Sequence, residues 1–132
     1  MKIKDLYGCE YDVSEKELYP LQKWYNQLID KTVQEITPGD VSRMLRQKLF
    51  PDLAMTRAID FLREDPFAGE LYEGEMLAAI AGMEDSLLAA YAEELKEVLK
   101  AASGRIAAYE WSYDGEEDEF REIVDAVSRK IM

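Results

Sequence analysis

The segment Thr37-Pro38-Gly39-Asp40-Val41-Ser42-Arg43-Met44-Leu45-Arg46-Gln47 carries a clear helix signal near the middle of the chain. Thr37 can cap the helix and Asp40 completes a reciprocal capping pair with it. Pro38 suits the first helical position, where no backbone N–H is needed. The side chains expected on the buried face are Val41, Met44, Leu45 and Leu49. Pro51 is expected to end this helix.

The same spacing of apolar residues predicts five more helices. One is expected to begin near Pro20, after Ser14 and Glu17, which resemble a capping pair. The apolar stripe of this region is Leu18, Leu21, Trp24, Tyr25, Leu28 and Ile29. The others cover about 52–64, 70–82, 85–104 and 114–131, the last with Asp114 and Glu117 as its capping pair. Gly74 weakens the helix over 70–82, and Gly104 is expected to stop the next one. Residues 65–69 form a turn, and 105–113 are compatible with a short extended stretch.

Length and composition predict that residues 1–132 form a single domain. No alternating strand pattern and no internal repeat occur. We therefore expect an all-α, single-domain bundle of about six helices joined by short turns. The absence of a membrane-length apolar run and the single cysteine, Cys9, predict a cytoplasmic protein.

Residue types exclude most catalytic and metal chemistry. The chain has no histidine and one cysteine, so zinc sites and catalytic triads cannot be built. Its glycines are scattered singly, which argues against a phosphate-binding loop. The acidic run 114–119 lacks the ligand pattern of an EF-hand. We expect no cofactor, no metal and no enzymatic activity, and we disfavour an enzyme that uses carboxylates alone.

The charge is distributed unevenly along the chain. Residues 1–63 hold ten acidic and ten basic side chains, whereas residues 64–132 hold eighteen acidic and six basic ones, so the net charge of −12 belongs to the second part. Such a field predicts a cationic partner and argues against nucleic acid or an anionic membrane.

The candidate binding residues gather before and within the last predicted helix. They are Trp111, Tyr113, Asp114, Glu116, Glu117, Asp118, Glu119 and Glu122. Carboxylates in a first helical turn are stabilised by the helix dipole, but this density exceeds what capping requires. Tyr109, Trp111 and Tyr113 would share one face if the segment were extended. Trp111 fits two roles, a plug in the core or an aromatic anchor for a partner.

Three stretches of the chain resemble immunity proteins of bacterial contact-dependent growth inhibition systems. They are Leu18-Tyr19-Pro20-Leu21-Gln22-Lys23-Trp24-Tyr25-Asn26, the segment 37–47 quoted above, and Asp65-Pro66-Phe67-Ala68-Gly69-Glu70-Leu71. The resemblance covers roughly residues 14–83. It implies a cytoplasmic helical protein that binds and neutralises the toxic C-terminal domain of a cognate effector, often a nuclease, and we favour a ribonuclease. The alternative is an acidic regulatory protein that mimics nucleic acid and binds a host nucleic-acid-binding protein. The oligomeric state stays open.

Overall fold

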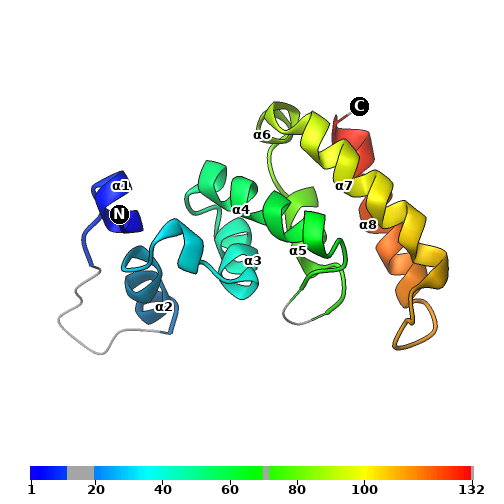
Figure 1. Cartoon of the computed structure of the whole chain (residues 1–132), viewed down its shortest axis with the longest axis horizontal. Helices are drawn as coiled ribbons and strands as arrows, with labels where there is room; N and C mark the ends of the chain where they lie inside the picture. Colours follow the sequence, from blue (N-terminus) through cyan, green and yellow to red (C-terminus); the bar gives the residue numbers. More distant parts are fainter. Residues whose placement is uncertain (12–19, 70–71, 132) are drawn as a thin grey trace.

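The computed structural model describes residues 1–11, 20–69 and 72–131 (Figure 1). These residues form eight α-helices, which are α1 (Ile3–Tyr7), α2 (Pro20–Ile29), α3 (Pro38–Gln47), α4 (Pro51–Glu64), α5 (Glu75–Ala81), α6 (Asp85–Ala90), α7 (Ala92–Arg105) and α8 (Glu116–Ile131). Two short 3-10 helices are η1 (Val33–Glu35) and η2 (Ile106–Ala108). Within the described ranges there is no strand beyond one isolated bridge, between Lys2 and Thr32. The predicted all-α class is confirmed, with eight helices in place of about six.

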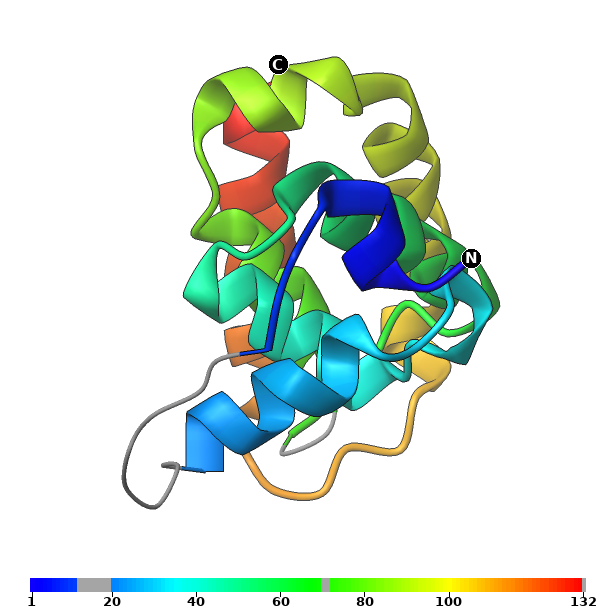
Figure 2. The same cartoon turned by 90° about the vertical axis from the view of Figure 1, so that its left-hand side faces the viewer.

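The helices follow one another along the long axis of the molecule. Figure 1 shows α1 and α2 at one end, α3 to α5 in the middle, and α6 to α8 at the other end. Figure 2 looks from the side of α1 and α2, which stand in front. Helix α3 packs on α4 and α5, and α8 packs on α5, α6 and α7. Fully buried side chains come from every region, among them Leu28, Met44, Met55, Leu77 and Phe120. The side of α8 opposite these packing contacts is exposed to solvent.

The predicted start of α3 is confirmed. The Thr37 hydroxyl accepts a hydrogen bond from the Asp40 N–H, and the Asp40 carboxylate accepts one from the Thr37 N–H, both at 3.1 Å. Asp40 also accepts hydrogen bonds from the Trp24 indole at 2.9 Å and the Lys31 ammonium at 2.6 Å, so it joins α2 to α3. Burial alone would raise the pKa of Asp40, but these donors lower it below its ordinary value.

The end of α3 differs from the prediction. The helix ends at Gln47, because Lys48 turns the backbone into the left-handed region at φ 54°. Phe50 is also left-handed, at φ 47°, and Pro51 then opens α4 instead of closing α3. Proline is well placed there, since the first helical residue needs no N–H. The third predicted helix therefore starts one residue earlier than expected.

The fourth predicted helix is shorter than its apolar pattern. Helix α5 begins at Glu75, not at residue 70, because Gly74 precedes it at φ +82°. A Cβ at Gly74 would lie 2.6 Å from a ring carbon of Phe120, so glycine also permits a close approach. Leu71, which the apolar spacing over 70–82 predicts to be buried, lies outside the described residues.

The fifth predicted helix is two helices. Tyr91, at φ −115° and ψ 19°, separates α6 from α7, and its hydroxyl donates to the Asp52 carbonyl in α4 at 3.4 Å. Neither proline nor glycine marks this break, so periodicity alone misses it. Gly104 stays inside α7, which ends at Arg105. Residues 106–108 form η2, and the extended stretch considered for 105–113 does not form a strand.

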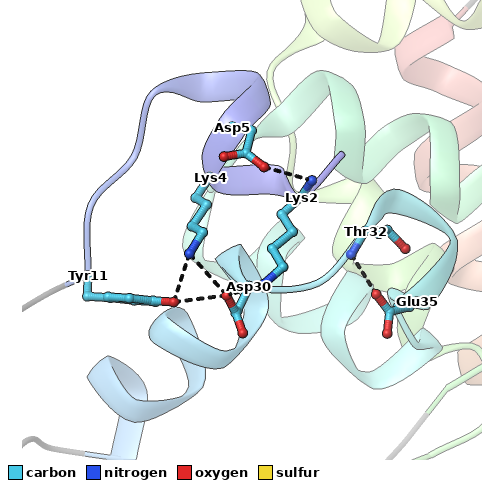
Figure 3. A network of polar contacts seen from close by, with 7 residues as sticks. All are labelled: Lys2, Lys4, Asp5, Tyr11, Asp30, Thr32 and Glu35. Atoms are coloured by element: carbon cyan, nitrogen blue, oxygen red, sulfur yellow. Dashed lines mark hydrogen bonds and ion pairs between the residues drawn. The ribbon is translucent and has the colours of Figure 1, made fainter.

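The first helix, α1, has only five residues, and no apolar stripe predicts it. Figure 3 shows how it is held: the Asp30 carboxylate at the end of α2 pairs with Lys2 at 3.0 Å and Lys4 at 3.2 Å. The Tyr11 hydroxyl donates to the same carboxylate at 2.9 Å. These partners, Lys2 first, lower the pKa of Asp30 to about 2. The possible capping pair Ser14 and Glu17 lies outside the described residues.

Candidate functional site

Four aromatic rings join two loops that are distant in the sequence. Phe67 stacks on Tyr109 with ring centroids 4.0 Å apart, and the ring of Trp111 meets Phe67 at 5.5 Å and Tyr109 at 4.7 Å. Phe120 of α8 lies beneath, 4.9 Å from Phe67 and 5.6 Å from Trp111. We call these four residues the aromatic cluster. It holds the loop after α4 and the loop before α8 against each other.

Polar contacts fix the same loops. The Trp111 indole N–H donates to the Ile106 carbonyl at 3.2 Å, and the Tyr109 hydroxyl donates a short hydrogen bond to Glu73. Burial, together with this carboxylate, raises the pKa of Tyr109 far above its ordinary value. Trp111 is half-buried and belongs to the cluster, while part of its ring stays accessible.

Tyr113 does not pack against the core as Tyr109 and Trp111 do. Its side chain is 52% exposed. Its hydroxyl donates to Glu119 at 2.6 Å, and this hydrogen bond raises the pKa of Tyr113 to about 12. The segment is irregular, so the alternation expected for an extended strand is lost at its last member.

The carboxylates at the start of α8 separate into different environments. Glu116 is buried, 6% exposed, and accepts a hydrogen bond from the Ser112 N–H at 2.7 Å. Helix α8 begins at Glu116 itself, so the predicted capping role of Asp114 is wrong. Glu117 is half-buried and pairs with Arg121 at 3.4 Å. Asp114 is exposed in the preceding loop.

Three carboxylates line the outer side of α8. Asp118, Glu122 and Asp125 follow one another four and three residues apart, opposite the buried Phe120, Val124 and Val127. All three side chains are exposed, and within the described part of the chain they make no ion pair or hydrogen bond. We call Asp118, Glu122 and Asp125 the acidic ridge. Asp125 is absent from the residues proposed from sequence, because that proposal stops at the first turns of the helix.

Ion pairs hold three of the seven described carboxylates of residues 1–63 and five of the seventeen described carboxylates of residues 64–131. Besides Asp30 and Asp40, Asp60 is also paired, with Arg57 at 3.1 Å. Among the described residues, the exposed or half-buried carboxylates that make neither an ion pair nor a side-chain hydrogen bond are, besides the acidic ridge, Glu10, Asp52, Glu64, Glu84, Glu94, Glu110 and Asp114. The uneven charge of the sequence is therefore present on the surface as well.

The site offers no evident place for a metal. Among the described residues, no three side chains of histidine, cysteine, aspartate or glutamate come together as metal ligands. None of the helices in the described ranges is both long and apolar enough to cross a bilayer. What the site presents is a charged surface with partly exposed aromatic rings.

Comparison with known proteins identifies the family. A model of the CDI (contact-dependent growth inhibition) immunity proteins matches residues 5–98, which is more than half of the chain. The chain therefore belongs to this family, and the resemblance found in the sequence is confirmed. No curated protein matches it. The match ends within α7, so the aromatic residues 109–113 and the acidic ridge lie beyond it.

Proposed function

We propose that this CDI immunity protein binds the toxin domain of its cognate effector in the cytoplasm and neutralises it as an inhibitor, without catalysing a reaction. The toxin we propose is a cationic nuclease, and a ribonuclease is the favoured class. The observation that carries this proposal is the acidic ridge, whose three neighbouring carboxylates make no ion pair within the described part of the chain.

The electrostatic reason is competition for the toxin's own charges. A nuclease must hold a polyanion, so it presents a positively charged cleft. An acidic surface is attracted to that cleft over a distance of about 8 Å at physiological salt and more at low salt. Such attraction can bring association rates to about 10⁸ M⁻¹s⁻¹ at low salt.

The ridge itself destabilises the free protein slightly. Asp118 and Glu122 are like charges four residues apart on one helix, an arrangement that costs roughly 0.2–0.5 kcal/mol. The dipole of α8 favours acid only in the first turn, so it does not explain Glu122 or Asp125. A cationic partner would remove this repulsion.

The contact surface we propose contains the exposed and half-buried residues of the sequence prediction. They are Tyr113, Asp114, Glu117, Asp118, Glu119 and Glu122, with the accessible part of Trp111 and with Asp125 added. Glu116 is left out of the contact surface because its carboxylate is buried and already hydrogen-bonded. Tight binding also needs desolvated anchors over a total of about 1,600 Å².

The test is binding to the toxin domain encoded immediately upstream. We expect a complex, with association that slows as salt rises from about 50 to 300 mM. The variant Asp118→Asn, Glu122→Gln, Asp125→Asn should associate about 10-fold more slowly at low salt and show a flatter salt dependence.

A matched control changes the net charge equally at other places. Glu64→Gln, Glu84→Gln, Glu94→Gln also removes three exposed or half-buried, unpaired carboxylates, and it should slow association by less than about 3-fold. Equal slowing by both variants would mean that overall charge, not the ridge, guides binding. Failure to bind the toxin domain at micromolar concentration would end the proposal and favour a host nucleic-acid-binding partner.

A further inference from the structure

The aromatic cluster brings together two loops, residues 65–69 with 72–74, and residues 109–115. The ring of Phe67 contacts the rings of Tyr109 and Trp111, and the Tyr109 hydroxyl donates a hydrogen bond to Glu73. In Figure 1 both loops lie at the lower edge of the molecule, one before α5 and the other before α8. The sequence-based site contains only the second loop.

Each loop presents one exposed tyrosine. Tyr72 is 53% exposed and Tyr113 is 52% exposed. The other exposed large apolar or aromatic side chains of the described residues are Met1, Leu6, Tyr7, Tyr11 and Leu21, all within the first 21 residues, so Tyr72 and Tyr113 are the two in the rest of the described chain. Tyrosine is one of the residue types enriched in interface hot spots. The position of these two tyrosines on the two joined loops points to a shared use.

The chain segments that flank both tyrosines carry only negative charges, while Arg46 of α3 pairs with Glu75, just after the first loop, at 3.3 Å. The sequence has no lysine or arginine from residue 64 to 95 or from residue 106 to 120. Exposed carboxylates on or beside the loops are Asp65, Glu110, Asp114 and Glu119. The excess of carboxylates favours a partner that brings positive charge to these tyrosines.

The loops are also held before any partner arrives. The four packed rings restrict them, and the hydrogen bond to Glu119 restrains the ring of Tyr113. A restrained aromatic side chain loses little conformational entropy on binding, which favours slow dissociation.

We propose that Tyr72 and Tyr113 together are the aromatic anchors of the toxin-binding surface, and that they contact arginine side chains on the toxin. This inference rests on the proposed function and extends its site to the loop before α5. The planar guanidinium stacks on a tyrosine ring while its N–H groups donate to a neighbouring carboxylate. Trp111 positions the loops through its contacts with the other three rings, and its accessible part borders the anchors on the same surface.

The experiment measures dissociation of the complex with the upstream toxin domain for Tyr72→Ala, Tyr113→Ala and Tyr72→Phe. We expect each alanine variant to raise the dissociation rate about 30-fold, the size of an interface hot spot. Tyr72→Phe keeps the ring face and should stay within about 3-fold of wild type. The matched control is Tyr7→Ala, which removes a tyrosine of similar exposure, 47%, from α1.

The outcomes separate the two proposals. If the wild type binds the toxin but Tyr72→Ala dissociates no faster than Tyr7→Ala, the anchor pair is overturned while the proposed function stands. If the wild type does not bind, both are overturned. Melting temperatures of Tyr72→Ala and Tyr113→Ala close to wild type, as their exposure predicts, show that faster dissociation reflects lost contact.

Discussion

Replacing Trp111 with alanine should lower stability through the aromatic cluster. A tryptophan of this kind buries most of roughly 200 Å², which at about 25 cal/mol per Å² amounts to about 3–4 kcal/mol. The three ring contacts add to this, and partial relaxation of the loop subtracts from it. We therefore expect a loss of about 3 kcal/mol in the free energy of unfolding, or about 12 °C in melting temperature.

Urea unfolding followed by far-UV circular dichroism measures this loss at pH 7, since it does not depend on tryptophan emission. Tyr113→Ala is the control, because Tyr113 is exposed and should change stability by less than about 0.5 kcal/mol. A loss below about 1 kcal/mol for Trp111→Ala, with an unchanged denaturant slope, would refute the supporting role of the cluster. Trp111 would then be free to serve mainly as a contact for the partner.

Three further predictions concern stability and titration. Asp40→Asn should lower the free energy of unfolding by about 2–3 kcal/mol at pH 7, because an amide replaces the carboxylate oxygen that accepts hydrogen bonds from Lys31 and Thr37. Since the pKa of Asp40 is lowered in the folded protein, this loss relative to wild type should be complete above about pH 4 and should shrink at lower pH. A loss that stays constant with pH would contradict this cause. Lys48→Gly should stabilise the protein by about 0.5–1 kcal/mol in urea unfolding, because glycine accepts φ 54° without strain, and unchanged or lower stability would count against strain there. Glu119→Gln should return the pKa of Tyr113 from about 12 towards 10 in an ultraviolet titration, with Tyr113→Phe identifying the signal, and an unmoved titration would contradict the hydrogen bond as its cause.

Local chemistry explains which parts of the fold could be predicted. The capping pair of Thr37 and Asp40 and the position of Pro38 act within four residues, so the sequence displays the start of α3 directly. The break at Tyr91 depends instead on packing between α6, α7 and α8 and on a contact with α4. No local residue preference marks it, since tertiary packing overrides helix periodicity there.

The candidate site shows the same division. Sequence spacing places acidic residues at the start of α8, but it does not tell that Glu116 turns inward to the Ser112 N–H. Sequence spacing also does not show that the loop of Tyr72 lies against the loop before α8. That connection depends on a tertiary contact, the stacking of Phe67 on Tyr109. Asp125 could have been found from sequence, since it continues the spacing of Asp118 and Glu122 on the outer side of the helix.

Formal charge alone does not define a binding surface, and the two parts of this chain show why. In the first part, Asp30, Asp40 and Asp60 are held in ion pairs by lysines or arginines of the same region. Each pair removes attraction for an outside cation, so these carboxylates contribute structure and little long-range field. Around α8 the carboxylates outnumber their possible partners, and the acidic ridge retains its field. Selective recognition then depends on the rings beside it, because a field accelerates encounter whereas desolvated aromatic contacts slow dissociation.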